Sequence, residues 1–269
     1  MSTAVTVKPG AGGSYDFLEQ LRHATDRVLL LDYDGTIAPF SADRNRAFPY
    51  LTVPELLDCI MSTCRTRVAL ISSRSAREIP ALLGLNPTPE IWGTYGIERL
   101  RPDGRYNVGW ISDDAQHALA EADAWLQVEG LEGATELKLG AIAVHWRGLS
   151  PADAEEVRTK AYRVLSPLAS RQTGLLLAEF DGGLELRLRS LSKADAVGAI
   201  LSEVSPQTPV AYLGDDTTDE VAFRALNDRG LTVLVRPTYR FTAAQIWLRP
   251  PDGLVQFLSD WVRACEGDL

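Results

Sequence analysis

The sequence has few cysteines and few histidines, and it contains no long apolar run. Among 269 residues there are 3 Cys and 3 His. Cys59, Cys64 and Cys265 form no CxxC pair, so neither a disulfide framework nor a thiolate zinc site is indicated. No apolar run reaches the roughly 18 residues that a membrane span needs, and the N-terminus lacks the charged and apolar regions of a secretory signal. We therefore expect a cytoplasmic protein with reduced thiols and no membrane partner.

Positive charge is also scarce. The chain has 27 Lys+Arg against 36 Asp+Glu, which gives a formal net charge of −9. With no basic stripe to neutralise phosphates, the sequence argues against a nucleic-acid partner. Its 45% hydrophobic and 23% charged residues are typical of a globular protein. The length allows one large domain or two modest ones.

Short apolar runs that end abruptly in polar residues alternate with helix-like segments. Such runs suit strands buried on both faces, and their alternation with helices predicts a parallel sheet wrapped by helices. The strand candidates are residues 28–31, 68–71, 91–92, 210–213, 231–235 and 246–248. The helix candidates are residues 14–25, with Ser14 as cap, then 53–64, 75–83, 192–204, 218–226 and 253–264.

The middle of the chain has a different pattern, with helices capped by Ser112 and Ser150 among paired strand-like segments. The turn Asp181-Gly182-Gly183 between two alternating segments is typical of an antiparallel hairpin. An antiparallel α+β block inserted in a parallel domain looks like a cap over an active site. We place a Rossmann-like α/β core at 14–105 and 189–269 and an α+β cap at 106–188. Within the cap the expected helices are 113–128 and 151–168, and the expected strands are 135–138, 141–146, 175–180 and 184–189.

Acidic clusters follow two of the predicted strands. Asp32 and Asp34 come after the first, and Asp215, Asp216 and Asp219 come after the run 210–213. Ligands bind at the carboxyl ends of strands in open α/β sheets. Carboxylates there could act as nucleophile and as general acid/base, and their oxygens suit Mg²⁺. On these residues alone, the first cluster could be only a turn, and the second could simply charge the start of the next helix.

Ser72 and Lys193 are two further candidates at the same edge of the sheet, one after a predicted strand and one at the start of a predicted helix. Ser72 follows the run 68–71 at the start of a helix, where a phosphate could bind. Lys193 opens the helix that returns the chain from the cap, where it could neutralise a phosphate and a charged nucleophile. Taken singly, such a serine is more often only a cap, and such a lysine is more often on the surface.

The order of these motifs is more specific than any one of them. Asp-x-Asp-Gly-Thr, then Ser72, then Lys193, then Gly-Asp-Asp-x-Thr-Asp resembles the haloacid dehalogenase superfamily of phosphatases. Within that superfamily, four segments are similar to trehalose-6-phosphate phosphatases. They are Leu-Asp-Tyr-Asp-Gly-Thr-Ile-Ala-Pro, the segment from Lys138 to His145-Trp146-Arg147, Glu185-x-Arg187, and Gly-Asp-Asp-Thr-Thr-Asp-Glu-x-x-Phe.

The resemblance implies a phosphatase that hydrolyses trehalose 6-phosphate through an aspartyl phosphate. It implies that Asp32 attacks phosphorus and that Asp34 protonates the leaving group and then activates water. Mg²⁺ would be held by Asp32, Asp215 and the backbone carbonyl of Asp34, while Ser72 and Lys193 bind phosphoryl oxygens. The resemblance further gives supporting roles to Thr36, Arg74, Asp216 and Asp219, and sugar-binding roles to Lys138, His145, Arg147, Glu185, Arg187 and Glu98. It leaves a functional link to a trehalose-phosphate synthase open.

The departures from the family pattern concern the substrate more than the chemistry. Tyr95 stands where the family commonly has His, and Ser73 stands where it commonly has Gly. Hydrolysis of another sugar or glycosyl phosphate is therefore the main alternative. A phosphomutase and a sugar-phosphate-binding regulatory domain are the others, although such regulatory domains typically lack one of the motifs found here.

Overall fold

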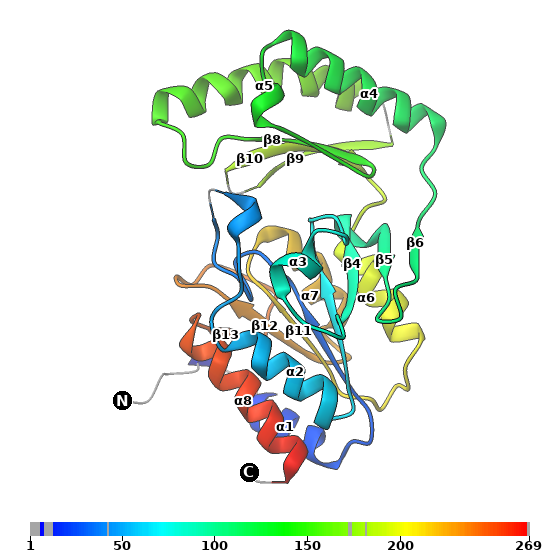
Figure 1. Ribbon diagram of the computed structural model, residues 1–269, viewed down its shortest axis with the longest axis vertical. Helices are drawn as coiled ribbons and strands as arrows, with labels where there is room; N and C mark the ends of the chain where they lie inside the picture. Colours follow the sequence, from blue (N-terminus) through cyan, green and yellow to red (C-terminus); the bar gives the residue numbers. More distant parts are fainter. Residues whose placement is uncertain (1–5, 8–12, 42, 172–173, 181, 268–269) are drawn as a thin grey trace. The chain divides into compact units, whose positions relative to one another are not determined.

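The computed structural model describes residues 6–7, 13–41, 43–171, 174–180 and 182–267. The chain divides into two compact units (Figure 1). Unit 1 comprises Met1–Tyr106 and Lys193–Leu269, and unit 2 comprises Asn107–Ser192. Within the described ranges, no helix is both long and apolar enough to cross a bilayer.

Unit 1 is built on a mostly parallel sheet, which confirms the predicted α/β class. The strand order is β1-β13-β12-β11-β2-β3-β4-β5-β6. Neighbours from β13 to β4 run parallel, whereas β1 and β5 pair antiparallel to theirs. The strands are β1 (Thr6–Val7), β2 (Arg27–Leu31), β3 (Thr66–Ile71), β4 (Glu90–Gly93), β5 (Glu98–Leu100), β6 (Tyr106–Val108), β11 (Val210–Gly214), β12 (Leu231–Val235) and β13 (Ile246–Leu248).

Helices cover both faces of this sheet because its central strands are apolar on both sides. In β2, Leu29 and Leu31 pack with α1, α2 and α8, whereas Val28 and Leu30 pack with α6 and α7. This alternation holds the carboxyl ends of the central strands at one edge of the sheet. The helices of unit 1 are α1 (Gly13–His23), α2 (Val53–Thr63), α3 (Ile79–Leu83), α6 (Lys193–Ser202), α7 (Glu220–Leu226) and α8 (Asp252–Glu266), with short 3-10 turns η1 (Arg44–Arg46), η2 (Thr94–Gly96) and η4 (Thr217–Asp219).

Helices α3 and α7 begin later than predicted, and the starts of α1, α6 and α8 differ from the prediction by one residue. Helix α1 begins at Gly13, one residue before the predicted start, and the side chain of Ser14, which was predicted to cap it, lies outside the described part of the structure. Helix α3 begins at Ile79 rather than at Ser75. The Ser75 hydroxyl and the Ala76 N–H donate to the Glu98 carboxylate at 2.9 and 3.1 Å, and this holds the start of the segment in a non-helical turn.

Unit 2 is a four-stranded antiparallel sheet, ordered β7-β8-β10-β9, with two helices on one of its faces (Figure 1). The predicted serine caps are confirmed. The Ser112 hydroxyl accepts the Ala115 N–H, and the Ser150 hydroxyl accepts the Asp153 N–H. The elements are β7 (Thr135–Lys138), β8 (Ala141–His145), β9 (Leu175–Phe180), β10 (Gly183–Leu188), α4 (Asp113–Val128), α5 (Pro151–Arg171) and the turn η3 (Glu132–Ala134).

The two faces of this sheet differ in chemistry. Ile142, Val144, Leu184 and Leu186 are fully buried, and they alternate along β8 and β10 with residues of the other face. That other face, called the polar face below, carries Glu136, Lys138, His145, Glu185 and Arg187. Of the predicted hairpin turn, Asp181 lies outside the described residues, Gly182 is in a turn and Gly183 already begins β10.

Candidate active site

Acidic side chains from β2 and β11 meet at the carboxyl edge of the unit 1 sheet. Asp32 directly follows β2, and its N–H donates to the carbonyl of Leu213 at 2.9 Å, so the two strands stay hydrogen-bonded up to this point. Asp32, Asp215 and Asp219 are buried, and each offers a carboxylate oxygen within 4.8 Å of the others. Three carboxylates so close in a buried place need positive charge to stabilise them.

Lys193, at the start of α6, supplies part of that charge. Its Nζ lies 2.8 Å from Asp32 Oδ1 and 2.7 Å from Asp219 Oδ1. Burial alone would lower the pKa of Lys193, but the charges of Asp219 and Asp32 outweigh burial and raise it. The lysine is therefore a permanent cation beside Asp32.

The positive charge of Lys193 does not offset the negative charge of all three carboxylates. Burial raises the pKa of Asp32 to about 7, against the opposing effect of Lys193. Burial and the charge of Asp32 raise the pKa of Asp215 well above its usual value. Among the described residues, Asp215 Oδ2 is a buried oxygen without a hydrogen-bond partner. Such an orphaned oxygen is costly, and paired hard carboxylate oxygens are what Mg²⁺ takes as ligands, so these residues fit a divalent cation.

Gly35 and Thr36 shape the same place from the turn after β2. The φ of Gly35 is +85°, and a Cβ there would overlap Asp215 Oδ2 and lie 2.7 Å from Phe40 Cζ. The Thr36 hydroxyl donates to Asp215 Oδ1 at 3.5 Å. The turn therefore approaches Asp215 as closely as only glycine permits.

Asp219 orders the loop after β11. Its Oδ1 accepts hydrogen bonds from Lys193 Nζ and the Tyr212 hydroxyl, and its Oδ2 accepts the N–H groups of Asp215 and Asp216, at 2.6–3.0 Å. Both oxygens are thereby occupied. The side chain of Asp216 accepts the Thr217 hydroxyl at 3.4 Å and forms a reciprocal capping box with Asp219.

Arg240 fixes the same loop from outside and was missed by the sequence analysis. Its guanidinium donates to the carbonyls of Asp215 and Asp216 at 3.3 and 2.7 Å and to Glu220 Oε1 at 2.5 Å. Glu220 also accepts the Ala243 N–H at 2.8 Å. The sequence gives no signal for this role, because Arg240 belongs to no motif and lies in a loop beyond β12.

Arg74 links the residues that follow β3 to those that follow β2. It donates to both carboxylate oxygens of Asp34, at 2.6 and 2.7 Å, while its own N–H donates to the Ser72 hydroxyl oxygen at 3.1 Å. The structure therefore places Ser72 and Asp34 at the same sheet edge as Asp32. A bidentate pair of this kind fixes the orientation of a carboxylate.

Glu98 lies in unit 1, where it is fully buried on β5. Besides Ser75 and Ala76, its carboxylate accepts the hydroxyls of Thr94 and Tyr106, at 2.5 and 2.8 Å. These contacts tie together the segments around Ser75, Thr94 and Tyr106, and the sugar-binding role that the resemblance implied for Glu98 stays a prediction. Tyr95, at the position of the family histidine, has a φ of +58° and donates its N–H to the Ser72 carbonyl at 2.9 Å.

The predicted sugar residues of unit 2 form a connected charge network on the polar face. Lys138 Nζ lies 3.0 Å from Glu185 and 3.7 Å from Glu136. His145 Nε2 lies 2.7 Å from Glu136, and Arg187 lies 3.7 Å from Glu185. Glu136 was missed, although its place two residues before Lys138 in a strand puts both on one face. Arg147 follows β8, and its N–H donates to the carbonyl of Gly182 at 3.2 Å.

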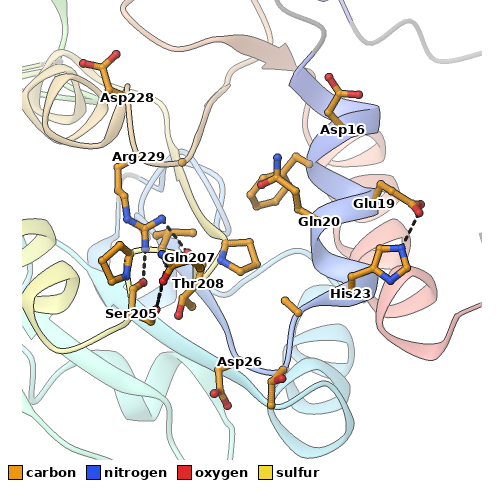
Figure 2. Close-up of a pocket in the computed structure, with 17 residues that line it drawn as sticks. Asp16, Glu19, Gln20, His23, Asp26, Ser205, Gln207, Thr208, Asp228 and Arg229 are labelled. Atoms are coloured by element: carbon orange, nitrogen blue, oxygen red, sulfur yellow. Dashed lines mark hydrogen bonds and ion pairs between the residues drawn. The ribbon is translucent and has the colours of Figure 1, made fainter.

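A depression of about 900 Å³ lies at the opposite edge of the unit 1 sheet (Figure 2). It is lined by segments that precede β2, β11 and β12, including Asp26, Gln207 and Asp228. Arg229 there donates to the carbonyls of Thr208 and Ser205. Because ligands of parallel sheets bind at the carboxyl ends of the strands, this depression is not the candidate active site.

Comparison with known proteins decides the family. Residues 30–244 match the family model described as trehalose-phosphatase. The chain belongs to the trehalose-phosphatase family. The resemblance drawn from the motif order is thereby confirmed.

Two curated relatives of this trehalose-phosphatase family member are each under 30% identical to it over the aligned residues. An uncharacterized glycosyl hydrolase of Mycobacterium tuberculosis is 29% identical over 98% of this chain and 20% of its own length. The trehalose-phosphate phosphatase of Mycobacterium marinum is 28% identical over 86% of this chain and 60% of its own length. The chain thus spans between a fifth and three fifths of the length of these relatives.

Solved structures share the fold. The C-terminal domain of trehalose-6-phosphate phosphatase from C. albicans has a TM-score of 0.77 at 18% identity and covers 99% of each chain. A haloacid dehalogenase-like hydrolase from B. subtilis has a TM-score of 0.59 at 14% identity, covering 87% of this chain and 99% of its own. The predicted haloacid dehalogenase type of core is thereby confirmed.

Proposed function

We propose that this chain is a magnesium-dependent phosphatase that hydrolyses trehalose 6-phosphate to trehalose and phosphate. The observation that carries the proposal is the buried cluster at the carboxyl edge of the unit 1 sheet. There Asp32 is paired with Lys193 beside Asp215 Oδ2, which has no hydrogen-bond partner within the described part of the chain. Membership of the trehalose-phosphatase family supports the choice of substrate.

In the proposed reaction, a carboxylate oxygen of Asp32 attacks phosphorus and the bond from phosphorus to the sugar oxygen breaks. Asp34 enters this step protonated on one carboxylate oxygen, while its other oxygen stays paired with Arg74, and it gives that proton to the leaving sugar oxygen. Water then attacks the phosphorus of the aspartyl phosphate, Asp34 takes up a proton from the water, and Asp32 is released with inorganic phosphate.

Positive charge and hydrogen-bond donors stabilise the transferring phosphoryl group. An ammonium carries three donors, so Lys193 can bind a phosphoryl oxygen while it remains paired with Asp219. Ser72 supplies a hydroxyl at the same edge. When bound, Mg²⁺ would be held by Asp32, Asp215 and the backbone carbonyl of Asp34, and it would offset negative charge on the phosphoryl oxygens.

The polar face of unit 2 is proposed to recognise the sugar. Buried hydroxyls need partners, and the linked carboxylates and cations of Glu136, Lys138, His145, Glu185 and Arg187 offer both acceptors and donors. The cytoplasmic location and the functional link to a synthase stay predictions.

The test is phosphate release, with and without Mg²⁺, from trehalose 6-phosphate, sucrose 6-phosphate, glucose 6-phosphate and glycosyl phosphoglycerates. Asp32→Asn is the blank and should show no turnover with an unchanged circular dichroism spectrum. We expect the highest kcat/KM with trehalose 6-phosphate and loss of activity in EDTA that added Mg²⁺ restores.

Results that differ from these expectations would each contradict a separate part of the proposal. Equal or faster turnover of another sugar phosphate would contradict the trehalose assignment but retain the phosphatase. Wild-type turnover by Asp32→Asn would remove Asp32 as nucleophile. Release of phosphate from none of the sugar phosphates would contradict the proposed function as a whole.

A further inference from the structure

Phe180, at the end of β9, lies on the polar face of unit 2 and was not among the expected site residues. The strand register places Phe180 opposite Gly183, and Gly183 opposite His145, so the three residues form one row across β9, β10 and β8. A Cβ at Gly183 would overlap the Phe180 ring and lie 2.7 Å from its Cε1. The ring therefore occupies the space above Gly183 that a side chain would otherwise fill.

Across this glycine the Phe180 ring reaches His145. The two ring centroids are 5.3 Å apart at an interplanar angle of 66°, an edge-to-face arrangement. On its other side, His145 Nε2 lies 2.7 Å from the Glu136 carboxylate. The imidazole is thus held between a carboxylate and an aromatic ring, and both rings stay partly exposed.

This end of the polar face combines two kinds of surface. Glu136, Lys138 and Glu185 offer charged acceptors and donors for hydroxyl groups, and Phe180 adds an apolar ring in the same row as His145. A sugar ring has the matching two surfaces, because its hydroxyls point outward at the edge while its C–H groups form an apolar face. An aromatic side chain packs against apolar surface, and polar groups around it fix orientation.

We propose that Phe180 is a specificity-determining residue that provides the apolar surface for a sugar ring bound beside His145. The inference rests on the proposed function, since it requires a sugar phosphate as substrate. Gly183 is its counterpart, because only a residue without a side chain leaves room for the ring in this position.

Two substitutions remove the aromatic surface by different routes. Phe180→Ala deletes the ring, whereas Gly183→Ala adds a Cβ where the ring lies and so displaces it from His145. The atoms in the way are the far end of a flexible side chain, and the φ of Gly183 is outside the left-handed range. Gly183→Ala should therefore fold even if Phe180→Ala does not. Phe180→Tyr keeps the ring, and Trp125→Ala removes an exposed aromatic residue from α4 as the matched control.

The full-length variants are compared in the phosphate-release assay with the sugar phosphate that the wild type prefers. We expect Phe180→Ala and Gly183→Ala to raise KM roughly fivefold to twentyfold. In both, kcat and the inhibition constant of inorganic phosphate should stay within about twofold, because the phosphoryl chemistry is assigned to unit 1. Phe180→Tyr and Trp125→Ala should retain the wild-type KM.

If Phe180 had only a structural role, its loss would not change KM selectively. If both variants keep the wild-type KM while phosphate is released normally, or if kcat and phosphate inhibition change as much as KM, the inference is overturned and the proposed function stands. If the wild type releases phosphate from none of the sugar phosphates, both the proposed function and this inference are contradicted.

Discussion

At the scale of single residues, Asp219 shows how one carboxylate can hold a loop together. It accepts two side-chain donors on Oδ1 and two backbone N–H groups on Oδ2. In Asp219→Asn an amide NH₂ would face donors at one of these positions, and Lys193 would lose part of its compensation. We expect the free energy of unfolding to fall by about 3 kcal/mol, measured by urea denaturation.

Asp216→Asn is the control for this prediction. The Asp216 side chain is partly exposed and accepts the Thr217 hydroxyl and the backbone N–H of Asp219. Asparagine keeps an oxygen that can accept both, so this substitution should change stability by less than about 0.5 kcal/mol. Equal stability of the two variants would contradict the ordering role of Asp219.

Arg74 gives the second prediction at this scale. A lysine keeps the charge but cannot bind both oxygens of Asp34 in a planar fork. We expect Arg74→Lys to lower kcat roughly tenfold or more, because a misoriented acid/base group loses much of its effect. Mg²⁺ affinity, measured by calorimetry, should be unchanged. Arg77→Lys on the exposed side of the same segment should keep full activity, and an unchanged kcat in Arg74→Lys would contradict the positioning role.

The residues that could be predicted from sequence follow strands or open helices within the motifs, as Asp32, Ser72 and Lys193 do. The contacts of Arg240 and Glu98 could not be predicted. Arg240 reaches back more than 20 residues to Asp216, and Glu98 on β5 binds Ser75 across the intervening α3 and β4. Such contacts depend on tertiary packing, which neither periodicity nor motif spacing reports.

At the scale of elements, the buried strands were the most predictable parts. The apolar runs 231–235 and 246–248 correspond to β12 and β13 without change, since strands buried on both faces exclude polar residues. β5 and β6 were missed because they lie at the polar end of the sheet. The charge of Arg99 on β5 is balanced only in the folded protein, where it binds Glu90 and Glu203.

The turn after β2 gives the prediction at this scale. In Gly35→Ala the positive φ and the overlap with Asp215 act together, and we expect a loss of about 2 kcal/mol or more in unfolding free energy together with weaker Mg²⁺ binding. Gly104→Ala is matched in φ, at +84°, but among the described residues a Cβ there meets nothing within 4 Å. It should lose only about 1 kcal/mol. Equal losses, with equal Mg²⁺ affinity, would contradict the close approach at Gly35.

At the scale of the whole molecule, the sequence predicts an insertion because the periodicity changes where unit 2 begins and the parallel pattern resumes with α6. Unit 2 ends at Ser192, at the N-terminal boundary of α6, whereas the expected cap ended at 188. The four intervening residues form the turn after β10, and no change of composition marks where that turn ends.

The pH dependence of folding stability gives a prediction for the whole of unit 1. Hydrogen bonds from Arg99 and Arg67 lower the pKa of Glu203 from 4.5 to about 2. A lowered pKa stabilises the folded protein above about pH 4.5, and this contribution is lost as the pH falls toward 2. Glu203→Gln should therefore lower the Tm at pH 7, modestly because the side chain is 38% exposed.

The difference in Tm between wild type and Glu203→Gln should shrink between pH 4.5 and pH 2. Glu132→Gln, at an exposed carboxylate outside this network, is the control and should show no such trend. A Tm difference that stays constant over this range would contradict the linkage.

The strand order of unit 1 also bears on the synthesis of the protein. β11 lies between β2 and β12, so the strand that precedes Asp32 lacks this partner until residue 214 has left the ribosome. Lys193, which binds Asp32, is likewise made 161 positions later. A nascent chain therefore completes unit 2 while the centre of the unit 1 sheet still has an open edge, and a product truncated before β11 retains Asp32 but lacks Asp215 and Asp219.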